Sequence, residues 1–257
     1  MAHMSPVPNA INVVTYNMHG FNQGCPMLLD LSLPFDIILC QEHWLLSDQL
    51  YKLCDAIDDF QCFAVSAMDD VCGRGVLKGR PFGGLAVFVR RSLCNPVECL
   101  VKCDRVLAVK VGNCIFICVY FPVYRNSPEY VSLVSNLIGI IESVITQNMH
   151  CSVIIGGDFN LEFLNGVTQS YAFNKFISSA NLHRCETTET TKHTFCCETR
   201  NPSSLIDHFL VSKCVIDKVD ACYTVASGLN FSDHLPLAMH CVLPLSYSHL
   251  LSYKTAP

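Results

Sequence analysis

Apolar positions in this chain gather in short runs of roughly four to eight residues, separated by polar turns. Runs of that length favour buried strands, because a strand crosses a domain in about five or six residues. The runs predict strands over residues 11–16, 35–40, 84–89, 152–157, 205–211, 221–225 and 237–242, and a hairpin of 107–111 with 114–120 across Gly112-Asn113.

Apolar residues recur at helical spacing over 44–56, 129–146 and about 170–179, and the polar stretch 186–204 predicts a loop or an exposed hairpin. Strands and helices mix without strict β-α-β alternation. This pattern favours packed mixed sheets with outer helices over a doubly wound parallel sheet. No linker, repeat or low-complexity segment divides the chain. We expect one domain over 11–245, a leader over 1–10 that opens with the vector-like Met1-Ala2-His3-Met4, and a boundary segment over 246–257.

Composition narrows the class of protein. Hydrophobic residues make up 51% and charged residues 15% of the 257 positions, which excludes a disordered chain. The apolar runs are shorter than the roughly 20 residues of a membrane-spanning helix, so no membrane association is expected. The 17 cysteines include no Cys-x-x-Cys pair. Their spacing argues against zinc, and their place in apolar runs predicts reduced thiols in an intracellular compartment.

Charge is unevenly distributed along the chain, whose net charge is −5. Residues 1–73 hold one basic residue against nine acidic ones, whereas residues 74–110 hold eight basic residues against two acidic ones. A basic segment in an acidic chain indicates a contact surface for an anionic partner. Arg74, Lys78 and Arg80 lie there among glycines, which let backbone and side chains approach phosphates closely. The alternative is a loop whose charges only keep it solvated.

Polar side chains stand where the predicted strands end: Asn17, Glu42, Tyr120, Asp158 with Asn160, Asp207, and Asp233 with His234. A rigid scaffold often holds catalytic groups in such positions. Together these carboxylates, amides and one imidazole could bind a hard divalent cation and an anionic substrate. Taken singly, each has a structural alternative. Asn17 and residues 158–160 could form turns, and Glu42 or Asp233 could cap a helix.

Six short motifs follow one another between residues 11 and 243. They are Thr15-Tyr16-Asn17-Met18-His19-Gly20, Gln41-Glu42, Tyr120-Phe121-Pro122, Gly156-Gly157-Asp158-Phe159-Asn160, Ile206-Asp207-His208 and Ser232-Asp233-His234. In this order they resemble the endonuclease/exonuclease/phosphatase superfamily. The pair Thr194-Phe195 and the string Ser204-x-Ile206-Asp207-His208 are most similar to the endonuclease domain of LINE-type (non-LTR) retrotransposons.

The resemblance implies a deoxyribonuclease-I-like α/β (α+β) four-layer sandwich of two packed mixed β-sheets flanked by helices. It also implies Mg²⁺-dependent hydrolysis of a DNA phosphodiester, with Mn²⁺ able to substitute.

The resemblance also assigns roles to residues of this chain. Glu42 is the principal metal ligand, supported by Asn17, and Asp233 can serve a second or moving metal position. Asp158 orients or deprotonates the attacking water, and Asn160 fixes that geometry. Tyr120 and His234 contact phosphate oxygens, and Asp207 hydrogen-bonds His234.

DNA contacts are expected from two regions. The first is the basic segment with Arg74, Lys78 and Arg80, and the second comprises Thr194, Arg200, Ser204 and Ile206. Two departures from the family pattern stand out. His19 occupies a position where these nucleases often carry Asp or Asn, and Ser204 stands where abasic-site repair enzymes place an aromatic residue.

The resulting hypothesis is an endonuclease that nicks double-stranded target DNA, so that the free 3′-hydroxyl primes reverse transcription. Such a domain is expected to be fused to a reverse transcriptase and to act in the nucleus, after assembly with RNA in the cytoplasm. One alternative keeps the fold and changes the substrate, to an abasic-site repair endonuclease or another phosphoesterase. A second is a catalytically inactive nucleic-acid-binding module.

Overall fold

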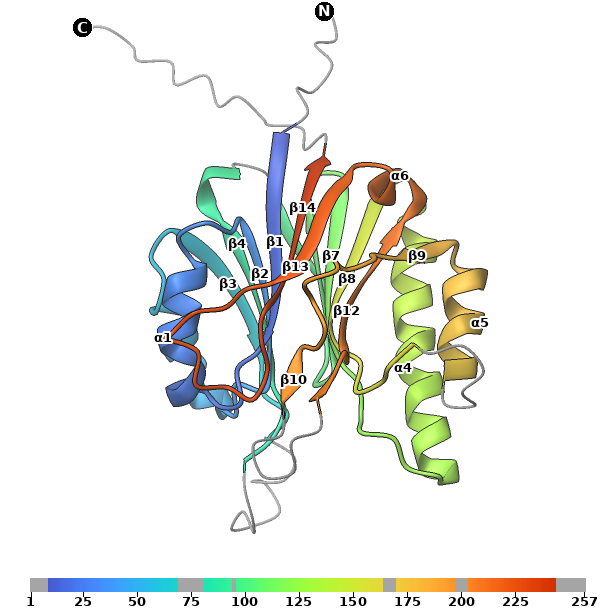
Figure 1. The fold of residues 1–257 in the computed structure, drawn as a ribbon, viewed down its shortest axis with the longest axis horizontal. Helices are drawn as coiled ribbons and strands as arrows, with labels where there is room; N and C mark the ends of the chain where they lie inside the picture. The colour runs from blue at the N-terminus through green and yellow to red at the C-terminus, as the bar shows by residue number, and fades with distance from the viewer. Residues whose placement is uncertain (1–8, 69–80, 94–95, 164–169, 197–202, 244–257) are drawn as a thin grey trace, which may run out of the picture.

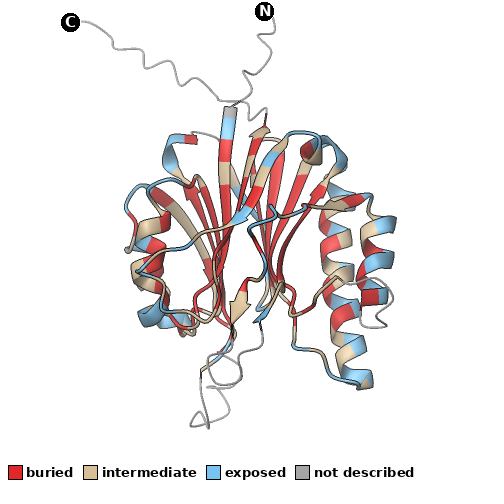
Figure 2. Cartoon of the chain, in the orientation of Figure 1, coloured by how far each residue is buried: buried red, intermediate tan, exposed pale blue. Residues whose placement is uncertain are grey.

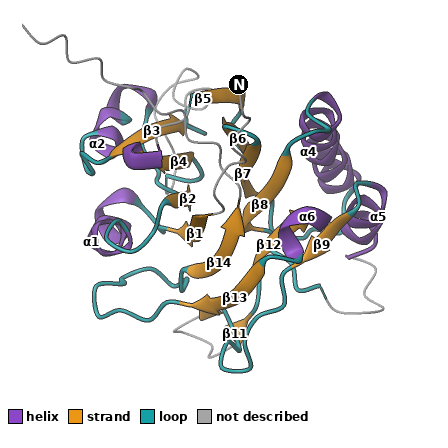
Figure 3. Ribbon diagram, turned by 90° about the horizontal axis from the view of Figure 1, so that it is seen from above, coloured by secondary structure: helices purple, strands orange, loops and turns teal. Residues whose placement is uncertain are grey.

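The computed structural model describes residues 9–68, 81–93, 96–163, 170–196 and 203–243. Two six-stranded mixed sheets pack face to face, with helices on both outer sides. Figure 1 shows helix α1 on one side and helices α4 and α5 on the other, and Figure 3 shows the same four layers from above. The predicted four-layer sandwich is confirmed.

The first sheet has the strand order β13-β14-β1-β2-β4-β3. Its strands are β1 (Asn9–Asn17), β2 (Ile37–Gln41), β3 (Phe60–Val65), β4 (Leu85–Arg90), β13 (Val219–Thr224) and β14 (Leu237–Leu243). Strands β1 and β2 are parallel, and the other neighbours in the sheet are antiparallel. Helix α1 (Phe21–Leu31) makes the crossover between the two parallel strands.

The second sheet has the order β5-β6-β7-β8-β12-β9. Its strands are β5 (Val97–Lys102), β6 (Val106–Val111), β7 (Cys114–Tyr120), β8 (Ser152–Asp158), β9 (Leu182–Arg184) and β12 (Asp207–Ser212). Helix α4 (Pro128–Gln147) crosses between the parallel strands β7 and β8. Helix α5 (Tyr171–Ser179) and the short helix α6 (Lys213–Ile216) follow, and β10 (Phe195–Cys196) pairs with β11 (Ser203–Ser204).

Three apolar cores hold the layers together, and Figure 2 shows the buried positions running along the strands. The inner faces of both sheets share one core, which includes Val13, Leu39, Phe116 and Phe209. A second lies between the second sheet and helices α4 and α5, and a third between the first sheet and α1. Because each sheet is covered on both faces, its strands read as continuous apolar runs.

Helix α4 is the one described helix that is long and apolar enough, by length and composition alone, to cross a membrane. The core helices of globular proteins pass the same test. Val134, Leu137, Ile141 and Val144 of α4 are buried in the second core, so packing inside the protein accounts for this apolar face.

The structure corrects one predicted helix. Residues 44–56 were expected to be helical, but only the 3₁₀ turn η1 (Ser47–Gln49) and the single-turn helix α2 (Tyr51–Cys54) form. Glu42 and Trp44 have φ angles of 58° and 60°, in the left-handed region, so a right-handed helix cannot start there. Apolar spacing alone did not reveal this backbone constraint.

Other elements were absent from the prediction, among them α1, β3, β5, β9 and α6. Helix α1 contains Gly24 and Pro26 and has no side-chain cap, so it lacks the usual helix signals. Gly24 is nevertheless needed, because a Cβ there would lie 2.5 Å from the Cβ of Met18. Strands β3 and β5 lie at sheet edges and are only partly buried, so their apolar pattern is weak.

Candidate active site

Three strand ends of the second sheet form a row of polar residues. Tyr120 on β7 is in register with Asp158 on β8, which is in register with Asp207 on β12. The close approach of β7 and β8 requires Gly157, because a Cβ there would lie 2.0 Å from the carbonyl oxygen of Val119. The glycine before Asp158 thus allows the strand pairing that aligns the row.

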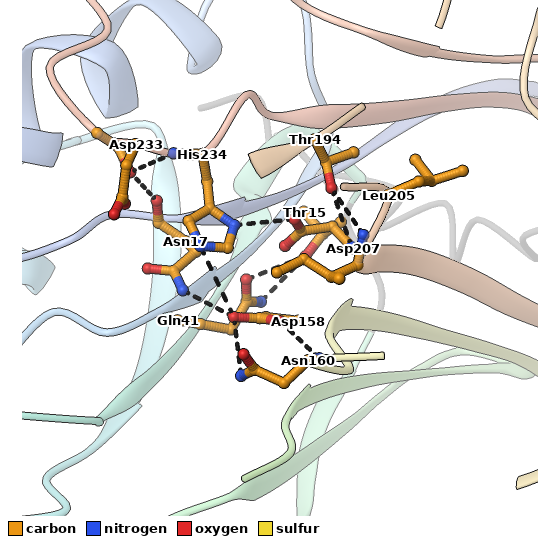
Figure 4. A network of polar contacts seen from close by, with 12 residues as sticks. Thr15, Asn17, Gln41, Asp158, Asn160, Thr194, Leu205, Asp207, Asp233 and His234 are labelled. Carbon is orange, nitrogen blue, oxygen red and sulfur yellow. Dashed lines mark hydrogen bonds and ion pairs between the residues drawn. The ribbon is translucent and has the colours of Figure 1, made fainter. Parts of the chain in front are cut away.

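Strands β1 and β2 of the first sheet end at the same place. Asn17 is in register with Gln41, which Glu42 directly follows. The Asn17 Nδ2 group donates to Asp158 Oδ2 at 3.0 Å and so connects the two sheets (Figure 4). Behind it, Gln41 Nε2 donates to Thr15 Oγ1 at 3.0 Å. Polar residues from both sheets therefore converge on one edge of the sandwich.

His234 reaches this edge from the segment between β13 and β14. Its Nδ1–H donates to Asp207 Oδ2 at 2.9 Å, and its Nε2 lies 3.9 Å from Asp158 Oδ2. Burial lowers the pKa of His234, but the neighbouring carboxylates raise it more, to about 9, and Asp207 makes the largest of these contributions. The site therefore favours a protonated imidazole at neutral pH. This contact confirms the predicted pairing of Asp207 with His234.

The carboxylate of Asp158 is fixed by its neighbours. Oδ1 accepts the Asn160 backbone N–H at 2.8 Å, and Oδ2 accepts Asn160 Nδ2 at 3.2 Å in addition to Asn17. Asn160 has a φ of 49° and also donates to the Phe121 carbonyl at 2.9 Å. Burial and the nearby charge of Asp207 raise the pKa of Asp158. A fixed carboxylate with a raised pKa is suited to holding a proton or a water molecule.

Glu42 lies at the end of β2, half-buried. Its Oε2 accepts the Gly83 backbone N–H at 3.0 Å and the indole N–H of Trp44. Burial and the adjacent carboxylates of Glu42 and Asp158 raise the pKa of Tyr120, so the phenol stays protonated. The guanidinium of Arg105 stacks over the Tyr120 ring at 5.1 Å. The Tyr120 hydroxyl therefore remains a hydrogen-bond donor at this edge.

His19 and Asp233 form a second pair of an imidazole and a carboxylate. His19 Nδ1 donates to Asp233 Oδ1 at 2.6 Å, and the His19 ring packs against Trp44 with centroids 5.0 Å apart. Burial raises the pKa of Asp233, but His19 and His234 lower it more. The residue that departs from the family pattern is thus part of the site.

The residues expected to contact DNA differ in how far they are buried, and some of them lie outside the described residues. Thr194 is fully buried, and its Oγ1 accepts the backbone N–H groups of Asp207 at 3.1 Å and Ile206 at 3.2 Å. This burial gives Thr194 a supporting role for Asp207 in place of the expected DNA contact. Ser204 pairs with Phe195 in the β10–β11 ribbon, and both Ser204 and Ile206 are partly exposed. Arg74, Lys78, Arg80 and Arg200 lie outside the described residues.

A groove of about 530 Å³ adjoins the row at Tyr120. Arg105, Arg125 and Phe82 line it, together with Glu129 at the start of α4. Two guanidinium groups and exposed aromatic surface beside a polar site suit a partner that carries both phosphates and flat rings. The composition of the groove therefore fits a nucleic acid strand.

The donor set also fits a hard divalent cation. Asp158, Asp207 and His234 offer ligand atoms that lie within 4.8 Å of one another. Among the described residues, Asp207 Oδ1 is buried without a hydrogen-bond partner, an arrangement that is costly unless a cation or water satisfies it. Glu42 and Asp233, the predicted ligands, lie outside this closely spaced group but add carboxylate oxygens at the same edge. Oxygen-rich sets of this kind are what Mg²⁺ and Mn²⁺ prefer.

The fold and this edge define a class: two-sheet α/β sandwiches with an acid, amide and imidazole site where the strands end. The sequence profile of the family described as "Endonuclease-reverse transcriptase" matches residues 114–238, a segment that carries Tyr120, Asp158, Asn160, Asp207 and His234. No curated protein matches the sequence of this chain.

Solved structures share the fold. The 3′ phosphatase NExo from Neisseria, bound to a product DNA hairpin, is 17% identical with a TM-score of 0.69, covering 90% of this chain and 99% of its own. The AP endonuclease LMAP from Leishmania major is 15% identical with a TM-score of 0.70, covering 91% and 88%. The endonuclease domain of TRAS1, a telomere-specific non-LTR retrotransposon, is 15% identical with a TM-score of 0.66, covering 92% and 100%. Residues 114–238 thus match that family's profile, and the chain as a whole shares the fold of these three structures.

Sequence reasoning missed two contributors to the site. Trp44 was expected only as the start of a helix over residues 44–56, yet it is half-buried and donates to Glu42. The pairing of His19 with Asp233 joins residues 214 positions apart and has no local signal. The only available hint for Trp44 was its place two residues after a candidate ligand.

Proposed function

We propose that this chain is an endonuclease that hydrolyses a phosphodiester bond of duplex DNA with a divalent metal ion, Mg²⁺ or Mn²⁺, and leaves a nick in one strand. The observation that carries the proposal is the Asp158 carboxylate. Asn17 and Asn160 hold it, and the His234 imidazole lies 3.9 Å from it. Such an arrangement places an acceptor for a water proton beside a cationic donor for a phosphate oxygen.

Each residue has a physical part in this reaction. Asp158 accepts a hydrogen bond from the attacking water and takes up its proton as the water oxygen bonds to phosphorus, and Asn160 keeps the carboxylate in one orientation. The P–O3′ bond breaks, and the departing 3′-oxygen takes a proton from solvent water to give the 3′-hydroxyl. The protonated Nε2 of His234 donates to a non-bridging phosphate oxygen, with Asp207 holding the ring through Nδ1. Tyr120 donates a second hydrogen bond from its protonated hydroxyl. These donors favour the transition state because negative charge grows on the phosphate oxygens as phosphorus becomes pentacoordinate.

Glu42 is proposed as the principal ligand of the cation, with Asn17 and Asp233 in support. A bound cation would supply Lewis-acid stabilisation of the charge on the phosphate. Glu42 is half-exposed at the strand end, where it accepts two hydrogen bonds on one oxygen. That leaves coordinating capacity on the carboxylate.

The biological role we propose is nicking of target DNA by a retrotransposon-encoded protein, so that the 3′-hydroxyl primes reverse transcription. The family description and the likeness to the TRAS1 endonuclease domain support it. The remaining polypeptide would then include a reverse transcriptase. Such a protein would act on DNA in the nucleus, after assembling with RNA in the cytoplasm.

The test is nicking of supercoiled plasmid with Mg²⁺, with Mn²⁺ and with EDTA, by the native chain and by Asp158→Ala. The proposal expects metal-dependent conversion to open circles by the native chain only. Equal rates on an abasic duplex and an intact one would favour the target-nicking role, whereas strong preference for the abasic site would favour the repair alternative. Binding of DNA without cleavage in any metal would identify an inactive binding module.

A further inference from the structure

Trp44 occupies an unusual backbone position beside Glu42. Both residues have positive φ angles, 60° and 58°, which non-glycine residues adopt only when their surroundings impose them. Here Glu42 N–H donates to the Gly84 carbonyl at 2.9 Å, and Trp44 N–H donates to the Gly83 carbonyl at 3.0 Å. This turn directs the indole back toward Glu42, to whose carboxylate its N–H donates.

The consequence is a fixed carboxylate. The Trp44 Nε1–H and the Gly83 backbone N–H both donate to Oε2 of Glu42. With two donors on one oxygen, the carboxylate cannot rotate freely, and Oε1 keeps one orientation. An indole N–H carries no charge, so it positions the anion without competing electrostatically with a cation.

The Trp44 ring also contacts His19, which extends the arrangement to the carboxylate of Asp233. The His19 ring lies 5.0 Å from the Trp44 ring at an angle of 59°. A Cβ on Gly20 would lie 2.6 Å from the Trp44 ring, so the glycine makes this packing possible. His19 in turn donates from Nδ1 to Asp233 Oδ1 at 2.6 Å. Glu42, Trp44, His19 and Asp233 therefore form one continuous chain of contacts across the site.

We infer that Trp44 and His19 are positioning residues, which hold the carboxylates of Glu42 and Asp233 in orientations suited to a divalent cation. This inference rests on the metal dependence in the proposed function. Groups that orient metal ligands typically change metal affinity about 10- to 100-fold when they are removed. Trp44 is also the single tryptophan of the chain, so its fluorescence reports on the state of Glu42 without any label.

The experiment measures Mn²⁺ binding directly, by electron paramagnetic resonance of free Mn²⁺ and by quenching of Trp44 fluorescence, with no DNA present. Trp44→Phe keeps the ring that packs on His19 and removes the N–H. His19→Phe keeps the ring that packs on Trp44 and removes the bond to Asp233. We expect each to weaken Mn²⁺ binding on the order of tenfold.

Two controls make the result specific. Asp217→Asn changes an exposed carboxylate that pairs with Lys213 on α6 and should leave Mn²⁺ affinity and the fluorescence response unchanged. Glu42→Gln can still accept the indole hydrogen bond but should lose the fluorescence response. Thermal melting checks that each variant is folded. If Trp44→Phe misfolds, His19→Phe alone decides.

Wild-type Mn²⁺ affinity in folded Trp44→Phe or in folded His19→Phe would overturn the inference. Its failure is distinguishable from failure of the proposed function. Mn²⁺ binding that depends on Trp44, in a protein that nicks no DNA, would uphold the positioning role and reject the endonuclease.

Discussion

Asp158 and Asp207 face each other in register on the neighbouring antiparallel strands β8 and β12. Both carboxylates are buried, and like charges directly opposite in a sheet destabilise it. The His234 imidazole next to both offsets part of the repulsion. The fold thus tolerates a local electrostatic cost at the position where the proposed chemistry needs two carboxylates.

Removing one of these charges should therefore stabilise the metal-free protein. Asp158→Asn keeps the shape of the side chain and one acceptor oxygen for Asn17, but it loses the acceptor for the Asn160 backbone N–H. Because the relieved repulsion should outweigh that loss, we expect the free energy of unfolding in EDTA to rise on the order of 1 kcal/mol, while nicking is lost. Urea denaturation measures the change. Asp220→Asn, at an exposed pair with His240, is the matched control and should give no gain. A destabilised Asp158→Asn protein would contradict the prediction that repulsion between the two carboxylates dominates at this position.

The pair of Asp207 and His234 should act as a unit in catalysis. His234→Ala should lower kcat by about 100-fold or more with little change in KM, because its contact strengthens in the transition state. Asp207→Asn should act in the same direction, and the double variant should be hardly worse than His234→Ala. Steady-state nicking rates test this, with His240→Ala as control. If the losses in kcat multiply in the double variant, Asp207 and His234 act independently.

Glu42→Ala should abolish nicking while the protein keeps its melting temperature within a few degrees. Glu42 is half-buried at a strand end, so its loss opens no core cavity, but it removes a carboxylate from the proposed cation site. The measurement is nicking over a wide range of Mg²⁺ concentration, beside thermal melting. Full activity at saturating Mg²⁺ would exclude an essential role as ligand.

The buried, neutral histidine His208 should make the free energy of unfolding sensitive to acid. Burial lowers the pKa of His208 from 6.5 to about 4, although its Nε2 binds the Leu161 carbonyl at 2.8 Å. Between these two pH values the unfolded chain binds a proton that the folded chain does not, so stability falls as pH drops from 6.5 toward 4.

The effect is measurable by urea denaturation at several pH values in this window. His208→Gln should reduce the slope of the free energy of unfolding against pH by up to about 1.4 kcal/mol per pH unit, which is the contribution of one proton. His150→Gln, at an exposed position, should leave the slope unchanged. An unaltered slope in His208→Gln would mean that other groups cause the acid sensitivity.

The basic segment yields a prediction from sequence alone. If Arg74, Lys78 and Arg80 touch DNA phosphates, each lost contact should reduce the slope of log K against log salt concentration by about 0.9 on duplex DNA. Their alanine variants should weaken binding similarly across sequences, because phosphate contacts carry no base information. Shortening the 186–204 stretch should instead shift the nicked sites. If the alanine variants shift the nicked sites and the shortened 186–204 stretch only weakens binding, the two regions have the opposite roles.

The sequence by itself determined which residues stand at the strand ends. Strands such as β1, β7 and β8 are buried on both faces, so their apolar runs are continuous, and the polar residues that end them are conspicuous. The order of the short motifs then indicated the superfamily and the four-layer fold. Asn17, Tyr120, Asp158, Asp207 and His234 were identified in this way.

Only the tertiary structure decided how these residues meet and what holds them. The positive φ angles of Glu42 and Trp44 depend on hydrogen bonds to Gly83 and Gly84, about 40 residues further along the chain. Thr194 is buried under the backbone of Asp207, although its sequence context indicated a surface contact. Hydrophobic periodicity records which face of an element is buried. Contacts between distant segments, which set these backbone angles and the pairing of His19 with Asp233, leave no such period in the sequence.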